Sequence, residues 1–136
     1  MKKIYIAALM ALSVLTFSCG KSTSKTPQEQ LKAGTWSLQS QIYVSNIGGN
    51  SYDSTIYSGY SNYTLKFLND TQVTEVNGNT TSTRDYQLVD DYTLSIWGNT
   101  YDIYTLTSTK LTFSRTKSYT DGTYYTYRYN YTRSTN

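Results

Sequence analysis

Apolar and polar residues alternate along most of the chain from Thr35 onward. Trp36, Leu38, Ile42 and Val44 share one parity, with Ser40 as the single gap. The same period returns in three later segments, whose apolar members are Tyr63, Leu65 and Phe67, then Tyr92, Leu94 and Ile96, then Leu111 and Phe113. The last segment alternates Tyr125, Tyr127, Tyr129 and Tyr131 with polar residues. A period of two over short segments predicts β-strands that bury one face and expose the other.

Turn signals separate these segments at regular intervals. They are Asn69-Asp70, Asn77-Gly78, Asp90-Asp91, Gly98-Asn99, Ser108-Thr109 and Asp121-Gly122. Asn-Gly and Asp-Gly are the strongest of them, because these residues tolerate the positive φ of a two-residue hairpin turn. Such short connections predict an all-β, up-and-down antiparallel meander of eight or nine strands, in which neighbours in sequence pair in space. Closure into a small barrel removes the exposed edges. Residues 45–61 are the least clearly marked part, with a loop expected at 47–50.

The first eighteen residues have the plan of a secretory signal peptide. Lys2 and Lys3 precede a short apolar stretch that ends at Cys19, the only cysteine of the chain. The boundary Leu15-Thr16-Phe17-Ser18-Cys19 resembles the lipobox of bacterial lipoproteins. This resemblance implies cleavage before Cys19 and lipid modification of its sulfur (diacylglycerol, palmitate). The alternative is a cleaved signal peptide followed by a free thiol.

The chain therefore divides into three parts. Residues 1–18 are the lipoprotein signal peptide, residues 19–33 a flexible tether, and residues 34–136 the β-domain. Residues 20–30 consist mainly of Ser, Thr, Lys and Gln with the only proline, Pro27, a composition that cannot bury a core.

The charge balance gives no reason to propose nucleic-acid binding. Loss of Lys2 and Lys3 leaves 10 basic residues against 9 acidic ones, and the basic residues are scattered. The residues after Cys19 include no acidic export tag, since Lys21 and Lys25 lie among Ser and Thr. No aspartate follows Cys19 directly, which by analogy with other Gram-negative lipoproteins implies the outer membrane, facing the periplasm.

Gly34-Thr35-Trp36 at the start of the first predicted strand resembles the G-x-W signature of lipocalins. The segments 63–67 and 106–113 make residues 31–133 similar to lipocalin-like lipoproteins of Bacteroidetes. The resemblance implies that the tryptophan packs across one barrel end under an arginine of the last strand. Arg133 shares the inward parity of the tyrosine row and Arg128 does not, so we expect Trp36 and Arg133 to form this pair. The chain is shorter than a typical lipocalin, which argues against a capacious ligand cavity.

Few residues could carry catalysis. The chain has no histidine, which excludes imidazole bases and ordinary zinc sites. Asp90-Asp91 is either part of a cation site or, as we prefer, a polar hairpin tip. Glu75 and Asp102 could form an acid pair, but both fall in strands where solvent-facing charge is expected. We therefore expect no enzymatic activity and no cofactor.

Fifteen tyrosines remain after the leader is removed. Such rows either line a ligand site or pack the sheet, and the packing interpretation is preferred. If the barrel binds a ligand, we expect its wall to be Tyr63, Leu65, Phe67, Leu94, Leu111, Tyr125, Tyr127, Tyr129 and Tyr131. Asp53-Ser54-Thr55 resembles the O-glycosylation pattern of exported Bacteroidetes proteins, which makes Ser54 a candidate acceptor in an expected loop.

Two non-enzymatic functions follow for a membrane protein held by its N-terminal lipid. The domain either carries a small apolar or amphipathic ligand in its barrel, or docks on another envelope protein or a glycan through its outer sheet face. An open interior would favour the carrier, and a tyrosine-filled one would favour the docking module.

Overall fold

The computed structural model describes residues 24–47, 52–58 and 62–133. One short helix precedes nine strands in these residues. The elements are α1 (Pro27–Lys32), β1 (Thr35–Asn46), β2 (Tyr52–Ser58), β3 (Tyr63–Phe67), β4 (Gln72–Asn77), β5 (Thr80–Asp90), β6 (Thr93–Ile96), β7 (Asn99–Leu106), β8 (Lys110–Ser118) and β9 (Tyr124–Arg133). The predicted class and strand number are confirmed.

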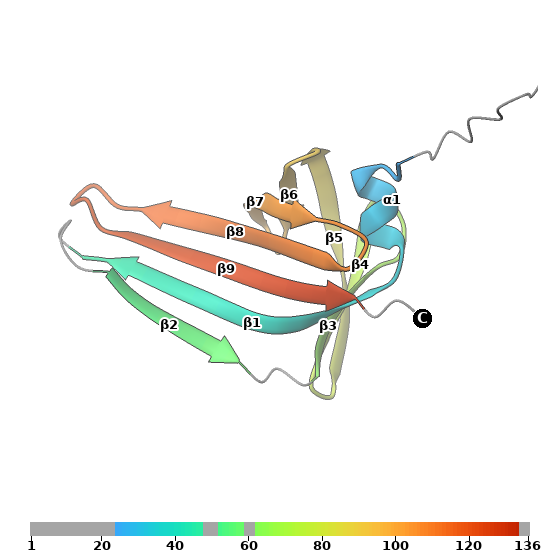
Figure 1. Cartoon of the computed structure of the whole chain (residues 1–136), viewed down its shortest axis with the longest axis horizontal. Helices are drawn as coiled ribbons and strands as arrows, with labels where there is room; N and C mark the ends of the chain where they lie inside the picture. Colours follow the sequence, from blue (N-terminus) through green and yellow to red (C-terminus); the bar gives the residue numbers. More distant parts are fainter. Residues whose placement is uncertain (1–23, 48–51, 59–61, 134–136) are drawn as a thin grey trace, which may run out of the picture.

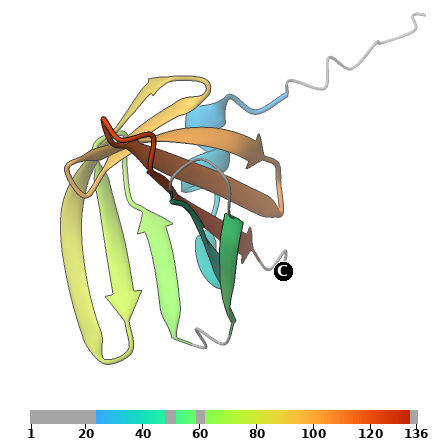
Figure 2. The ribbon, with the colours of Figure 1, turned by 90° about the vertical axis from the view of Figure 1, so that its left-hand side faces the viewer.

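The strands form a closed antiparallel barrel. From β3 to β9 each strand pairs with the next, and β9 pairs with β1, which closes a barrel of eight strands. Figure 2 shows β3 to β5 on one side of this barrel and β8 with β9 on the other. Closure is confirmed, and each of the six predicted turns falls at the junction of two consecutive strands. Because every barrel strand has two partners, the barrel itself has no free edge.

The ninth strand, β2, lies outside the barrel. One edge of β1 is divided: Thr35–Ser37 pair with β3, whereas Ser40–Asn46 pair with β2. The prediction that all sequence neighbours pair is therefore wrong for β2 and β3, because β1 separates them. The far halves of β1, β8 and β9 extend past the barrel with β2, and we call these four segments the projecting sheet (Figure 1).

A β-bulge in β1 changes which side chains face inward. Leu38 pairs with Tyr131 and Ser40 with Asn130, so Gln39 is an extra residue. The inward parity of Trp36 and Leu38 then passes to Gln41 and Tyr43, which pair with Tyr129 and Tyr127. The expectation that Ile42 and Val44 continue the face of Trp36 is wrong, because side chains alternate strictly only in a regular strand.

The barrel is filled by its own side chains. Fourteen apolar or aromatic residues are buried together in one cluster. They are Leu31, Trp36, Leu38, Leu65, Phe67, Val73, Tyr86, Leu94, Ile96, Tyr101, Ile103, Leu111, Phe113 and Tyr131. Tyr92, expected on this face, is instead 74% exposed in the turn before β6.

Helix α1 closes one end of the barrel. Leu31 is fully buried, and its carbonyl accepts a hydrogen bond of 2.9 Å from the Trp36 indole nitrogen. The Arg133 guanidinium lies 5.0 Å from the centre of the Trp36 ring, as strand parity predicted, and donates to the Gln30 carbonyl. The prediction of a flexible tether over residues 19–33 is wrong for residues 27–32, because this turn of helix gains a buried leucine and two backbone acceptors for core side chains.

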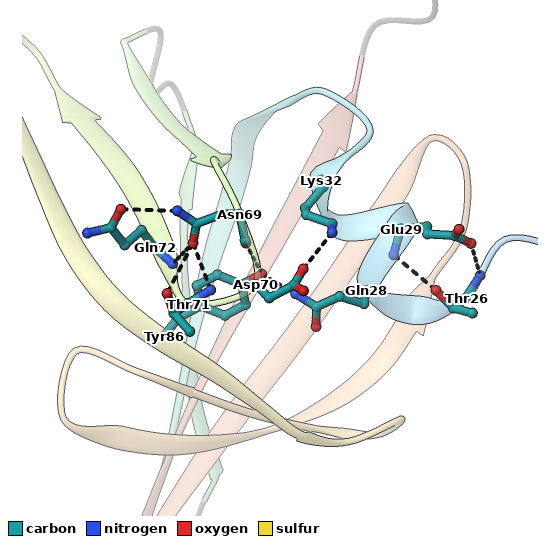
Figure 3. Close-up of polar contacts among 9 residues, drawn as sticks. All are labelled: Thr26, Gln28, Glu29, Lys32, Asn69, Asp70, Thr71, Gln72 and Tyr86. Atoms are coloured by element: carbon teal, nitrogen blue, oxygen red, sulfur yellow. Dashed lines mark hydrogen bonds and ion pairs between the residues drawn. The ribbon is translucent and has the colours of Figure 1, made fainter.

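Polar contacts fix α1 against the loop between β3 and β4 (Figure 3). Thr26 and Glu29 form a reciprocal capping box at the start of the helix. Lys32 forms an ion pair of 2.5 Å with Asp70, and the Gln28 amide donates to the Tyr86 hydroxyl. That hydroxyl in turn donates to the Asn69 carbonyl at 2.7 Å. Among the described residues, no helix is long and apolar enough to span a membrane.

Candidate functional site

The residues expected to line a ligand cavity do not form one surface. Five of them belong to the buried core, namely Leu65, Phe67, Leu94, Leu111 and Tyr131. Tyr63 and Tyr129 are partly buried against that core. Tyr125 and Tyr127 lie beyond it, on the projecting sheet.

We call the barrel end opposite α1 the mouth. Next to the mouth, the barrel interior is occupied by aromatic side chains that contact one another. Phe113 stacks on Tyr131 with ring centres 5.5 Å apart, and Tyr101 meets Phe113 edge-on at 5.3 Å. Tyr129 lies 5.4 Å from Phe113 and 6.0 Å from Tyr101. Offset and edge-on aromatic pairs of this kind are stabilising, and together they fill the space where a ligand was expected.

Trp97 covers this aromatic group at the mouth. Trp97 and Gly98 form the two-residue turn between β6 and β7, with φ of 56° and 69°. A left-handed backbone is disfavoured for tryptophan by about 1–2 kcal/mol. The indole nevertheless packs against Tyr101, Tyr129 and Phe113, with ring centres 5.7–6.1 Å away. The backbone strain is thus offset by burial of a large ring.

A carboxylate holds the indole in place. Glu75 Oε2 accepts a hydrogen bond of 3.0 Å from the Trp97 indole nitrogen and lies 3.2 Å from Arg84 Nε. The other carboxylate oxygen accepts a hydrogen bond from the Tyr63 hydroxyl. Burial and the adjacent charge of Glu75 raise the pKa of Tyr63 far above its ordinary value. This network uses Glu75 as a structural anchor at the mouth.

The expectation that Glu75 faces solvent is wrong, and it does not pair with Asp102. Its side chain is only 14% exposed, whereas Asp102 alternates with buried Tyr101 and Ile103 and points outward. Glu75 lies opposite Leu65 of β3, an inward position. The parity of Val73 and Glu75 was the available signal, since Val73 is fully buried.

Tyrosines gather on the face of the projecting sheet that continues the barrel interior. We call this group, which is Tyr43, Tyr57, Tyr119, Tyr125 and Tyr127, the tyrosine face. Tyr43 stacks on Tyr125 at 5.7 Å with 14° between the rings, and lies 5.1 Å from Tyr127. Loss of water and the neighbouring tyrosines raise the pKa of Tyr43. Tyr57 and Tyr119 remain 50% and 44% exposed, so the rings are available to solvent.

A groove of about 360 Å³ lies where the tyrosine face meets the mouth. We call it the mouth groove, and its lining residues are Asn99, Tyr101, Arg115, Lys117, Tyr119, Tyr127 and Tyr129. Arg115 and Lys117 enter it from alternate positions of β8, opposite Tyr127 and Tyr125. Burial raises the pKa of Tyr101, an effect that the nearby charge of Arg115 opposes.

Other sequence candidates lie elsewhere. Asp90 accepts a hydrogen bond from the Tyr92 amide and so shapes a hairpin tip, and no cluster suited to a metal occurs among residues 24–47, 52–58 and 62–133. Ser54 is exposed but lies in β2 opposite Val44, so the loop expected there is wrong. The signal peptide, Lys21 and Cys19 lie outside the described residues.

Four residues of the mouth were not predicted as site residues, namely Glu75, Trp97, Arg115 and Lys117. For Trp97 the signal was the tryptophan directly before Gly98 in a tight hairpin, where Asn or Asp is ordinarily favoured. For the two cations it was their shared parity with Leu111 and Phe113 along β8.

Comparison of the chain with known protein families, with curated proteins and with solved structures found no match.

Proposed function

We propose that this protein is a lipid-anchored, non-enzymatic binding module of the cell envelope that holds an extended glycan on its tyrosine face. The observation that carries the proposal is the tyrosine face itself, on a sheet that extends beyond a filled barrel: four of its five rings are joined by ring contacts, and Tyr57 and Tyr119 are about half exposed. Tyrosine offers a flat apolar ring and a hydroxyl that hydrogen-bonds, the combination that suits a sugar ring.

The position of helix α1 indicates how the anchored protein would be oriented on the membrane. The lipid anchor is proposed at Cys19, and the chain enters the fold through α1 at the barrel end away from the projecting sheet (Figure 1). An anchor at the α1 end leaves the tyrosine face pointing away from the membrane. We propose the outer membrane, on its periplasmic side, as the location.

The filled interior favours the docking interpretation over the carrier. A ligand inside the barrel would have to displace the Trp97 indole, which is held by Glu75 and three aromatic rings. It would then meet Phe113 and Tyr131, which are already stacked on each other. The tyrosine face needs no such rearrangement, because two of its rings are about half exposed.

Affinity electrophoresis in gels that contain soluble polysaccharides tests the proposal. We expect the purified protein to be retarded by at least one polysaccharide, and Tyr127→Ala to abolish most of the retardation. Tyr92→Ala is the matched control, since Tyr92 is exposed but lies in the hairpin before β6, away from the tyrosine face. Equal loss in both variants, or no retardation of the wild type, contradicts the proposal.

A lipophilic fluorescent probe tests the carrier in parallel. We expect no saturable binding of the probe at micromolar concentration. Saturable binding that Trp97→Ala strengthens would favour the barrel interior as the ligand site, because removal of the indole opens the mouth.

A further inference from the structure

We propose that the mouth groove is a subsite for an oxyanion, the carboxylate or sulfate ester of an acidic sugar in the glycan. This inference rests on the proposed function and adds the class of glycan. Two cationic side chains, Arg115 and Lys117, share this groove with tyrosine rings.

The spacing of the two cations suits a single group. They stand at alternate positions of β8, and alternate residues of a strand are about 7 Å apart and project from the same face. An oxyanion between them would be within reach of both side chains, because each is long and flexible. The groove also offers the Tyr127 hydroxyl for the remaining sugar hydroxyls.

Neither cation is neutralised within the described part of the chain. The two ion pairs found there use Lys32 with Asp70 and Arg84 with Glu75. No carboxylate lines the groove. Arg115 and Lys117 are therefore available to pair with an anionic ligand. Charge-assisted hydrogen bonds to an oxyanion are about twice as strong as neutral ones.

Aromatic neighbours hold both cations toward the groove. Tyr101, which is buried, lines the groove together with Arg115. The Lys117 ammonium lies 5.0 Å from the centre of the Tyr119 ring. A cation positioned in this way loses less side-chain freedom when it binds an anion.

An acidic glycan fits better than nucleic acid or a membrane surface. A duplex is tracked by a row of basic residues that makes many phosphate contacts, whereas the groove holds two. The groove also opens beside the tyrosine face, whose stacked rings extend the contact surface beyond the anion site. A sugar chain that carries an acidic group uses both features.

Binding to a matched set of oligosaccharides tests the subsite. The ligands are an oligogalacturonate, a sulfated dextran oligomer and unmodified dextran of equal length, with inorganic sulfate and anionic phospholipid vesicles as separate arms. We expect at least one acidic oligomer to bind at least about tenfold more tightly than dextran, since one charge-assisted bond accounts for that ratio. Whether the carboxylate or the sulfate ester binds more tightly identifies the group.

Matched charge variants locate the site. We expect Arg115→Gln and Lys117→Gln each to lose about tenfold in affinity for the acidic oligomer with dextran binding unchanged. Lys110→Gln is the control, because Lys110 is exposed on the same strand but near the α1 end, and it removes the same charge. Thermal unfolding of all three variants verifies that they fold, and the exposed Lys117 provides the test if Arg115→Gln is unstable.

Each outcome separates the two proposals. If acidic and neutral oligomers bind equally and all three variants resemble the wild type, the subsite is wrong and the glycan module stands. If no oligomer binds, the proposed function itself is wrong. Binding that is confined to vesicles assigns the cations to a lipid headgroup, and binding of inorganic sulfate alone shows an anion site without a sugar; both overturn the inference.

Discussion

The two ends of the barrel use the same residue types in opposite ways. At the α1 end Trp36 is fully buried, its indole nitrogen is hydrogen-bonded to Leu31, and Arg133 stacks on its ring. At the mouth the second tryptophan, Trp97, has a strained backbone and is only partly buried. Beyond it, tyrosine rings are exposed, and Arg115 and Lys117 have no carboxylate partner in the described chain.

The difference separates side chains that stabilise the fold from side chains that can bind a ligand. A buried, fully hydrogen-bonded tryptophan contributes to folding, and neither its ring nor its N–H can contact a ligand. Cations without a carboxylate partner and half-exposed rings contribute little to folding, because water already satisfies them. We therefore expect substitutions at the α1 end to change stability and substitutions on the tyrosine face to change binding.

The largest contrast is expected between Trp36→Ala and Tyr127→Ala. Removing the Trp36 side chain leaves a void in the core and should lower the free energy of unfolding by about 3–5 kcal/mol. Tyr127 is only partly buried in the projecting sheet, and removal of its side chain should lower the free energy of unfolding by about 1 kcal/mol. Urea unfolding followed by tryptophan and tyrosine fluorescence measures both.

The same pair of variants can contradict the comparison. If Tyr127→Ala destabilises the protein as much as Trp36→Ala, the tyrosine face is part of the folding core. Its rings would then be unsuitable as a separate binding surface.

A second contrast lies between two tyrosines in the mouth. Tyr63 donates to Glu75, so Tyr63→Phe leaves a poorly exposed carboxylate short of one donor and should destabilise by about 1–3 kcal/mol. The Tyr131 hydroxyl is buried without a partner among the described residues. Tyr131→Phe removes an unsatisfied group and should leave stability unchanged or slightly raised.

Thermal or urea unfolding of the two Phe variants under identical conditions makes this comparison. The ring contacts of Tyr131 with Phe113 and Tyr63 are retained by phenylalanine, so the readout isolates the hydroxyl. A larger loss for Tyr131→Phe than for Tyr63→Phe would show that the Glu75 network is not what holds the mouth.

A third prediction concerns the stack at the α1 end. The effects of Trp36→Ala and Arg133→Ala on the free energy of unfolding should be non-additive in a double-mutant cycle, with a coupling of about 0.5–2 kcal/mol. Gly34 shows how close the approach is, because a Cβ there would lie 2.7 Å from Arg133 Cδ. Gly34→Ala should therefore weaken the coupling, measured in the same cycle on the alanine background. A coupling near zero in the wild-type background would rule out the stack as an energetic contribution.

Much of this fold could be predicted from alternation and turns, because both are local properties. The six turns and the buried residues of β3, β6 and β8 follow from them. The bulge at Gln39 could not be predicted, since a bulge is set by the register with a partner strand. Helix α1 carried a readable signal in Thr26-Pro27 with Glu29, a capping box with proline at the first helical position.

The site was predicted less well for a physical reason. Parity assigned Tyr125 and Tyr127 to the inward face correctly, but that face continues beyond the barrel, where no opposite wall exists. How far a strand extends past its neighbours depends on the lengths of paired strands. The mouth groove and the contacts of Glu75 also depend on which strands pair and how long they are. From the sequence, only the strand parity of these residues could be read.

The smallest expected effect is that of the Lys32–Asp70 ion pair, and pH reveals it. The Lys32 ammonium lowers the pKa of Asp70 below its ordinary 3.8, so the pair stabilises the fold above that pH and loses its contribution as the pH falls through the folded-state value. Lys32→Met should therefore lower the urea midpoint slightly at neutral pH and not in strong acid. The effect is slight because the Asp70 side chain is 71% exposed. Lys66→Met, an exposed lysine of β3, is the control and should show no such pH dependence. If the difference between Lys32→Met and the wild type persists below the pKa of Asp70, the lysine acts through packing of α1 and not through the ion pair.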